Sequence, residues 1–291
     1  MVSKSMECKK VYSRKDIIIG IVTYQPDIGK LKQCLEAIRE QDDKVVVYDN
    51  GSQNIEEIEN IIRVIFFKYK LIKNIYNVGI AKALDKIMEY AEQNGYAWVL
   101  SIDQDSLLQV GIINAYLREI NNFSEVGMFT CLIKDRNFAD KKYEKQNTLI
   151  KEVEYCITSG ALTSVNAYKK TQGYDESFFI DCVDFDICYS LRENGYKIYR
   201  INHVGLLHEV GHGENKRFLW KKIIIYHEKS FRIYYLARNT ILMYKKHKKM
   251  FPWYVMIKKE LGLFIKIVFY EDNKQSKLQR FWKGILDANR I

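Results

Sequence analysis

The segment WVLSIDQDSLL, residues 98–108, joins an apolar run to two acidic residues that flank a glutamine. The run starts two residues earlier as YAWVLSID (96–103) and predicts a buried β-strand, since a short continuous apolar run is typical of a strand covered on both faces. Asp103 and Asp105 therefore stand where that strand ends. We ask what a pair of carboxylates does at this place.

Three strand–helix units precede this strand. The predicted strands are residues 16–24, 44–52 and 70–74, and apolar residues recur between them at helical spacing. These residues are Ile28, Leu31, Leu35 and Ile38, then Ile55, Ile58, Ile62 and Ile65, then Ile80, Leu84, Ile87, Met88 and Ala91. Strands that alternate with helices predict an α/β fold in which a parallel sheet is covered by helices on both faces.

Polar or small residues follow all four predicted strands. They are Thr23 and Tyr24, Asp49, Asn50, Gly51 and Ser52, Asn77, Val78 and Gly79, and Asp103, Gln104 and Asp105. Ligands of open parallel sheets bind beyond the carboxyl ends of the strands, so the four loops predict one shared site.

Each of these loops has two interpretations. The carboxylates at 103–105 suit a hard divalent cation such as Mg²⁺ or Mn²⁺, or they form a solvated acidic turn. Residues 49–52 form either a strand-to-helix turn or a clamp for a nucleoside, with the carboxylate accepting from a base N–H or a ribose hydroxyl. Residues 77–79 either start a helix or let the backbone approach a ligand closely at the glycine.

Composition narrows the class of protein. The chain has 291 residues, is 47% hydrophobic and carries a net charge of +10, with the excess positive charge after residue 214. Such a balance predicts a folded protein with phosphate-bearing partners. The six cysteines (Cys8, Cys34, Cys131, Cys156, Cys182 and Cys188) include no CxxC pair and predict free thiols in a reducing cytoplasm. The first 16 residues lack the apolar stretch of a signal peptide.

A second acidic cluster lies in FIDCVDFDICYSLRENG, residues 179–195. Apolar residues at helical spacing predict a helix that begins near Asp184 and ends before Gly195. Acidic residues near a helix N-terminus are electrostatically favourable without any further role, so the cluster alone does not establish a site.

The region after Glu214 is basic and aromatic. Its predicted helical stripe contains Phe231, Tyr234, Tyr235, Arg238 and Leu242. Residues 252–270 are interrupted by Lys258, Lys259, Glu260 and Lys266, and are therefore too polar to span a bilayer. Their mixture of lysines with aromatic residues suits a helix on a membrane surface, a buried helix or a dimer interface.

The order VTY, YDNGS, NVG and SIDQDS, followed by TSGALTS (158–164) and GYDESFFIDCVDFDICYSLRENGYKIY (173–199), resembles family 2 glycosyltransferases with the GT-A fold. The resemblance covers roughly residues 16–240. It is greatest to the bacterial rhamnosyltransferases that build O-antigen, capsule and cell-wall polysaccharides. It implies a Rossmann-like sheet that binds a nucleotide sugar, followed by a helical C-terminal extension.

By position, the resemblance implies that the D-x-D motif binds the metal that holds the donor diphosphate. Asp105 is the expected direct ligand, and Asp103 is expected nearer the ribose or bound to the metal through water. His208 is a further candidate contact to the metal or the diphosphate, with a histidine that caps a strand or loop as the alternative. The expected cation is Mg²⁺ or Mn²⁺.

The catalytic base of the family is the Asp of a motif that is commonly Glu-Asp. Here the pair reads Val183-Asp184, so the Glu is missing. Asp184 aligns with the base, and Asp181 and Asp186 are its rivals. An inverting transfer needs such a base within hydrogen-bond reach of the acceptor hydroxyl.

The expected nucleotide-sugar contacts come from all four loops and from the C-terminal helix. They are Thr23, Tyr24, Asp49, Asn50, Asn77, Gly79, Asp103, Gln104 and Arg238. Arg238 belongs to the sequence YYLARN, which recurs in the resemblance. Its helix either packs on the catalytic domain or supplies a basic contact to diphosphate or acceptor.

The resemblance implies a metal-dependent, inverting transferase that moves L-rhamnose from dTDP-L-rhamnose to a lipid-linked polysaccharide precursor. It would work in the cytoplasm, peripherally at the inner face of the cell membrane. The expected parts are a tail (1–15), a catalytic domain (16–214) and a helical extension (215–291). The alternatives are a family 2 transferase that uses a UDP-hexose, an inactive scaffold, and a nucleic-acid-binding protein. The last lacks a recognisable nucleic-acid-binding motif, and clustered acids would repel phosphate without a cation.

Overall fold

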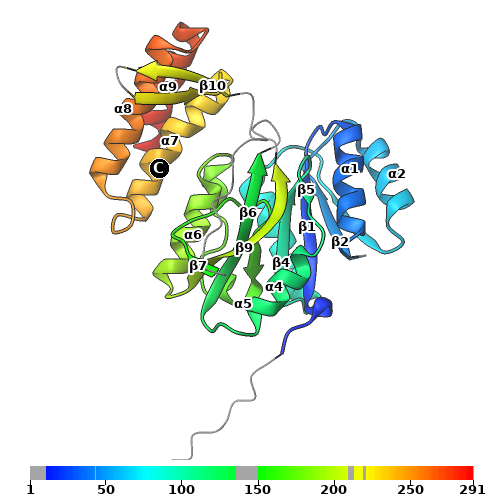
Figure 1. Ribbon diagram of the computed structural model, residues 1–291. Helices are drawn as coiled ribbons and strands as arrows, with labels where there is room; N and C mark the ends of the chain where they lie inside the picture. The colour runs from blue at the N-terminus through cyan, green and yellow to red at the C-terminus, as the bar shows by residue number, and fades with distance from the viewer. Residues whose placement is uncertain (1–10, 43, 136–149, 209–212, 219–220, 291) are drawn as a thin grey trace, which may run out of the picture.

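The computed structural model describes residues 11–42, 44–135, 150–208, 213–218 and 221–290. Its first part alternates strands and helices as the sequence predicts (Figure 1). The elements are η1 (Arg14–Asp16), β1 (Ile17–Thr23), α1 (Ile28–Arg39), β2 (Val45–Asp49), α2 (Ile55–Ile65), β3 (Tyr69–Lys73), α3 (Ile80–Gln93) and β4 (Trp98–Asp103).

These four strands form the parallel half of the sheet, in the order β3-β2-β1-β4. The register places Thr23 opposite Asp49, and Val22 opposite Asp103. The carboxyl ends of β1, β2 and β4 therefore meet at one edge of the sheet, which is where the sequence predicts the site.

The second half of the sheet is mixed, so the expectation of a parallel sheet holds only up to β4. β8 runs antiparallel between β4 and β6, β9 is parallel to β6, and β5 and β7 are antiparallel to β9. An antiparallel neighbour needs no crossover helix, which is why the helix–strand alternation stops after residue 103. The elements are β5 (Leu107–Leu108), α4 (Ile112–Ile120), β6 (Val126–Asp135), β7 (Ile150–Glu152), β8 (Leu162–Ser164), α5 (Val165–Tyr168), η2 (Glu176–Phe178), α6 (Val183–Glu193) and β9 (Lys197–His208).

Helices cover both faces of the sheet, as predicted. Ile17, Ile19 and Ile21 of β1 pack into the core shared with α1, α2 and α4. Ile18 points the other way, into the core shared with α3, α5 and α6. Because successive side chains of a strand point to opposite faces, both cores require apolar residues, and this explains the continuous apolar run of β1.

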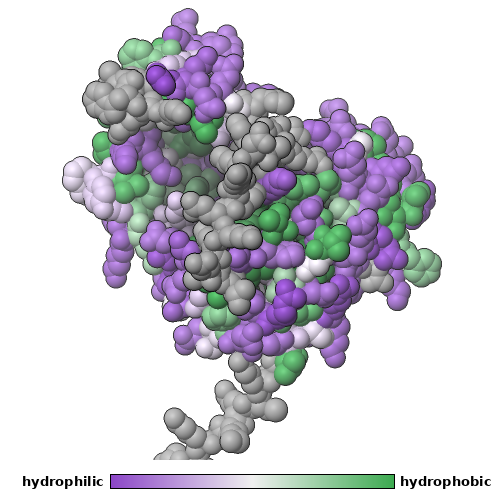
Figure 2. Space-filling model, in the orientation of Figure 1, coloured by the Kyte–Doolittle hydropathy of each residue, from purple (hydrophilic) through white to green (hydrophobic). Residues whose placement is uncertain are grey.

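The C-terminal region comprises the hairpin β10 (Glu214–Phe218) and β11 (Lys221–Ile225), and the helices α7 (Ser230–Lys246), α8 (Trp253–Phe269) and α9 (Lys274–Ala288). The helices were expected and the hairpin was not. Ile233, Ala237, Ile267 and Phe281 form a separate small core. The group lies beside the α6 side of the sheet in Figure 1, and Figure 2 shows a recess between it and the rest of the molecule.

Two further expectations concern the cysteines and the membrane. The five cysteines in the described residues are free thiols, and Cys34, Cys131 and Cys188 are buried, whereas Cys156 and Cys182 are partly exposed. Cys8 lies outside the described residues. Among the helices that the structure describes, none combines the length and the apolar character that a membrane span requires.

Candidate active site

A cavity of about 570 Å³ opens at the carboxyl edge of the sheet. Tyr24, Asn50, Gln104 and Asp103 line it from the loops after β1, β2 and β4. Across from the sheet, the segment before α6 and the start of α7 add Phe179, Ile180 and Arg232. A cavity of this volume is within the range of sites for nucleotide-sized ligands.

Asp103, Asp105 and His208 form a cluster on the wall of this cavity, with one ligand atom of each within 4.8 Å of the others. Strand pairing explains why they meet. Leu107 of β5 pairs with Leu207 of β9, so the loop that carries the two aspartates lies beside His208, the last residue of β9.

A small hydrogen-bond chain orients His208. Its Nδ1 lies 2.8 Å from the hydroxyl of Ser106, which accepts at 3.2 Å from the hydroxyl of Ser159. The Ser159 hydroxyl in turn accepts from the backbone N–H of Asp103 at 3.0 Å. Both serines are buried. Buried partners of this kind fix the ring orientation of a metal-binding histidine.

The electrostatics of the cluster favour a cation. Burial, with the nearby carboxylates of Asp184 and Asp105, raises the pKa of Asp103 to about 7. A cation beside Asp103 would favour the charged form of its carboxyl group. The two carboxylates suit the oxygen preference of Mg²⁺ or Mn²⁺, and the imidazole adds a nitrogen ligand of the kind that transition metals accept.

Asp184 is the second residue of α6, and its Oδ1 accepts a hydrogen bond from the backbone N–H of Thr158 at 3.1 Å. Burial raises its pKa above the ordinary range, although the Thr158 hydrogen bond acts in the opposite direction. The residue is partly exposed, although Asp184 is not among the described residues that line the cavity.

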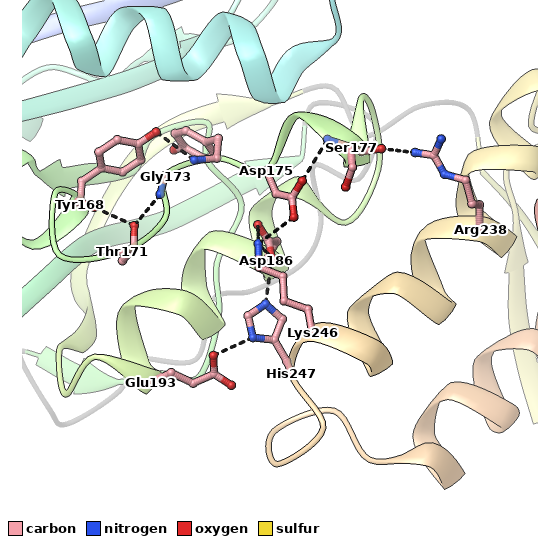
Figure 3. Close-up of polar contacts among 11 residues, drawn as sticks. Tyr168, Thr171, Gly173, Asp175, Ser177, Asp186, Glu193, Arg238, Lys246 and His247 are labelled. Carbon is pink, nitrogen blue, oxygen red and sulfur yellow. Dashed lines mark hydrogen bonds and ion pairs between the residues drawn. The ribbon is translucent and has the colours of Figure 1, made fainter. Parts of the chain in front are cut away.

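The two rivals of Asp184 are engaged elsewhere. Asp186 is 1% exposed and accepts from His247 Nε2 at 2.8 Å and from Lys246 Nζ at 3.1 Å (Figure 3). Asp181 forms a bidentate ion pair with Arg232, with N–O distances of 2.5 and 3.3 Å. Neither carboxylate is free to accept a proton from a substrate without breaking these contacts.

Thr23 and Asp49 are buried beneath the cavity and are not among the described residues that line it. The Thr23 hydroxyl donates to Asp49 Oδ1 at 2.9 Å, and Asp49 Oδ2 accepts from the backbone N–H groups of Gly51 and Ser52 at 3.2 and 2.9 Å. The structure thus favours the turn over the nucleoside clamp for this carboxylate, because its acceptor sites are already used.

Tyr24 and Gln104 act as a pair. The Gln104 side chain accepts from the backbone N–H of Tyr24 at 2.8 Å and donates to its carbonyl at 3.3 Å. This ties the loop after β1 to the loop after β4. The ring of Tyr24 is 45% exposed on the cavity wall, where a planar base can stack on it.

Asn50, Asn77 and Gly79 shape the adjoining wall. Asn50 accepts from the Val78 N–H at 2.9 Å and donates to Asn77 Oδ1 at 3.0 Å. Gly79 has φ of +89°, and a Cβ there would lie 2.6 Å from the carbonyl oxygen of Phe179. Only glycine fits this position, because both the backbone conformation and the close approach exclude a side chain.

The structure does not place Arg238 of α7 in the cavity as expected, and another arginine of the same helix faces the cavity. Arg238, expected as a nucleotide-sugar contact, is 8% exposed and donates to the carbonyl groups of Ser177 and Phe178, away from the cavity lining that the described residues form. Arg232 lines the cavity instead, and the helical stripe predicted from the sequence does not contain it. Both lie on one predicted helix, and helical spacing alone does not tell which arginine faces the site.

Comparison with known proteins agrees with this geometry. A family model described as glycosyl transferase family 2 matches residues 18–172, just over half of the chain. The dTDP-rhamnosyl transferase RfbF of Shigella flexneri is 25% identical over 289 residues, which is 93% of this chain and 93% of RfbF.

Two solved structures are similar in fold. The mannosyltransferase PcManGT from Pyrobaculum calidifontis, in complex with GDP-Man and Mn²⁺, aligns with a TM-score of 0.57 at 17% identity, over 94% of this chain and 75% of that one. S. aureus TarS aligns with a TM-score of 0.53 at 12% identity, over 94% of this chain but only 43% of TarS. At these identities the likeness concerns the fold alone, and it confirms the expected GT-A arrangement.

Proposed function

The chain belongs to glycosyl transferase family 2, and from this premise we propose that it transfers L-rhamnose from dTDP-L-rhamnose to a hydroxyl group of a lipid-linked polysaccharide precursor. It is therefore an enzyme of the glycosyltransferase class. The choice of donor is supported by the similarity to the dTDP-rhamnosyl transferase RfbF along nearly the whole chain. The observation that carries the proposal is the cluster of Asp103, Asp105 and His208 on the wall of a nucleotide-sized cavity.

We assign Asp105, Asp103 and His208 as the residues that would hold Mg²⁺ or Mn²⁺. When bound, such a cation neutralises negative charge that develops on the departing nucleoside diphosphate. The chain itself supplies the binding surface for the nucleoside. The exposed ring of Tyr24 would stack on the base, and Gln104 holds the Tyr24 backbone in place for this contact.

Asp184 is our candidate for the general base of an inverting, direct displacement at the anomeric carbon. The proposal is supported by the contacts that occupy Asp181 and Asp186, which leave Asp184 as the available carboxylate of the three. The Thr158 amide holds one of its oxygens. The raised pKa of Asp184 makes its carboxylate a better proton acceptor near neutral pH. No covalent enzyme intermediate is required.

A thermal-shift panel tests the donor. It would compare dTDP, UDP and GDP, and dTDP-L-rhamnose against UDP-glucose and UDP-galactose, each with and without Mn²⁺. We expect the largest stabilisation from dTDP-L-rhamnose with Mn²⁺. One methyl group on the base is worth only about 1–3 kcal/mol, so the sugar should discriminate more than the base does. Greater stabilisation by a UDP-hexose would move the protein to the alternative branch, and no stabilisation by any nucleotide sugar would refute the proposal.

We also propose that residues 16–214 act as the catalytic domain and that residues 215–291 bring it to the inner face of the cell membrane, where a lipid-linked acceptor would lie. This is supported by exposed apolar side chains on α8 and α9. They are each 50–62% exposed and are Trp253, Tyr254, Ile257, Leu261, Trp282 and Leu286. The exposed Lys258 and Lys283 each directly follow one of them in the sequence. Aromatic residues with lysines are typical of helices at an anionic lipid interface.

Flotation with anionic liposomes tests this surface. Changing Lys258→Glu with Lys283→Glu should reduce co-flotation at low salt, because each lysine adds roughly 1 kcal/mol near an anionic membrane. Lys259 is less suitable for the test, since its Nζ lies 4.9 Å from the ring centre of Phe185. The matched control is Lys68→Glu with Lys70→Glu, beside and within β3. Unchanged flotation of the first variant, or dimers in place of lipid binding, would refute the membrane assignment.

A further inference from the structure

The segment between η2 and α6 has a strained backbone. Phe179, Asp181 and Cys182 have φ values of +58°, +66° and +63°. A residue other than glycine in such a conformation costs of the order of 1–3 kcal/mol and persists only where its surroundings hold it. The segment bears on function because Phe179 and Ile180 line the cavity and the candidate base Asp184 follows directly.

Asn239, from the middle of α7, holds this segment. It is fully buried, and its side-chain nitrogen donates to the carbonyl groups of Phe178, Ile180 and Asp181 at 2.8, 2.7 and 2.9 Å. An amide group has two N–H donors, so the three carbonyls share two hydrogens. One buried side chain thus donates to three carbonyl groups at the end of η2 and in the strained segment.

Arg238 fixes the orientation of that amide. Its Nε and Nη2 donate to Asn239 Oδ1 at 3.0 and 2.9 Å, and Nη2 also donates to the carbonyl of Ser177 (Figure 3). The guanidinium group lies 4.8 Å from the ring centre of Tyr235, which stacks on Phe179. Because the guanidinium binds the amide oxygen, the amide nitrogen must face the strained segment.

The C-terminal end of α7 binds residues of α6 that follow the candidate base in the sequence. His247 contacts Asp186 and Glu193 at 2.8 and 2.9 Å, and Lys246 also binds Asp186, so the helix α6 is attached to the end of α7 (Figure 3). Asp184 lies between these two attachment points in the sequence. Contacts from α7 and its C-terminal cap therefore hold the chain both before and after Asp184.

We propose that Arg238 and Asn239 are positioning residues for the transfer reaction, holding residues 178–182 so that Asp184 and the cavity wall have their working geometry. The inference rests on the proposed function, because it takes Asp184 as the base. Neither Arg238 nor Asn239 is among the described residues that line the cavity. Because both donate hydrogen bonds to carbonyl groups of residues 177–181, we expect an effect on turnover to pass through that segment.

The first test compares Asn239→Ala and Arg238→Lys with a control on the same helix. The control, Lys245→Met, removes a 2.6 Å hydrogen bond from Lys245 Nζ to the carbonyl group of Ala288 in α9. Turnover is measured as release of dTDP from dTDP-L-rhamnose with Mn²⁺ and water as acceptor, well below the melting temperature of each variant.

We expect Asn239→Ala to lower kcat by about 10–100-fold, because a displacement near 1 Å at a reacting group can cost on the order of 10²-fold. Arg238→Lys keeps the charge but loses the planar fork, and should lower kcat by a smaller factor. Lys245→Met should keep the wild-type kcat. Wild-type kcat in both Asn239→Ala and Arg238→Lys would overturn the inference.

A double-variant cycle separates positioning from general stability. In an Asp184→Asn background, Asn239→Ala should change kcat by less than about threefold, because groups that act as a unit are not additive. A purely structural role predicts the same loss in both backgrounds and would overturn the inference. Wild-type kcat in Asp184→Asn alone would instead refute the base assignment of the proposed function.

Hydrogen–deuterium exchange gives a readout that needs no activity. Asn239→Ala should speed exchange in peptides that cover residues 178–184, whereas Lys245→Met should leave exchange in these peptides unchanged. Unchanged exchange in Asn239→Ala would mean that Asn239 does not hold the segment, and would also overturn the inference.

Discussion

Glu260 offers a test of how the C-terminal helices pack. It lies on the buried face of α8 with 9% of its surface exposed, and neither carboxyl oxygen has a hydrogen-bond partner among the described residues. The neighbouring hydroxyl of Thr240 donates to the carbonyl of Leu236 at 2.8 Å. Burial raises the pKa of Glu260 to about 8. We therefore expect this carboxyl group to be neutral in the folded protein at neutral pH.

The size of the effect follows from linkage between proton binding and folding. With a pKa of about 8 folded and 4.5 unfolded, the stability associated with Glu260 is complete below pH 4.5 and is lost as the pH rises toward 8. The loss is about 1.4 kcal/mol at pH 5.5 and about 4 kcal/mol at pH 8, as upper limits, since one pKa unit is about 1.4 kcal/mol. Glu260→Gln keeps the shape, stays neutral and removes the loss.

Thermal unfolding at pH 5.5 and pH 8 measures this difference. For a chain of this size about 1 kcal/mol corresponds to roughly 2–4 °C, so Glu260→Gln should raise Tm by roughly 6–12 °C more at pH 8 than at pH 5.5. The control, Glu57→Gln, changes an exposed glutamate of α2 and should shift Tm little at either pH. An equal shift at both pH values, or a lowered Tm at pH 8, would refute the reasoning.

Three further predictions concern the site. Asp184→Asn should keep its dTDP affinity, measured by calorimetry, and should lower turnover on the order of 10²-fold or more. Because burial raises the pKa of Asp184, wild-type turnover should rise with pH as this carboxyl group ionises. The variant should lose this rise. Asp186→Ala should cost roughly 3–5 kcal/mol by leaving buried charges unpaired, seen as a lower Tm, while the folded variant still binds dTDP. Gly79→Ala should weaken dTDP binding at least about tenfold, because its Cβ meets the Phe179 backbone. A wild-type pH profile in Asp184→Asn, a wild-type Tm in Asp186→Ala or a wild-type dTDP affinity in Gly79→Ala would contradict the corresponding expectation.

Local sequence pattern was sufficient for the parallel half of the fold and for the loops that reach the cavity. The apolar runs of β1 and β4 set strand positions, and parallel pairing then brings Tyr24, Asn50 and Asp103 to one edge. It did not reveal β8, because a three-residue strand in an antiparallel position has too few residues to show a period.

The sequence does not show how deeply each side chain is buried or which side chains face the cavity. Asp49 has the residue type of a ligand-binding group, but its carboxylate is satisfied by Thr23 and the following turn. Arg232 and Arg238 differ by six residues on one helix, and only tertiary packing decides that the first faces the cavity and the second faces Ser177. Ser177 lies more than 50 residues before Arg238 in the chain, so a local sequence pattern does not relate the two.

Calorimetric titration of dTDP, with EDTA and then with Mn²⁺, tests the central claim most directly. If Asp103, Asp105 and His208 hold a cation that binds the donor diphosphate, Mn²⁺ should tighten wild-type dTDP binding at least about tenfold, which is about 1.4 kcal/mol. Asp105→Ala should abolish this gain without unfolding the protein. Equal dTDP affinity with EDTA and with Mn²⁺, or a gain that survives in Asp105→Ala, would contradict the account.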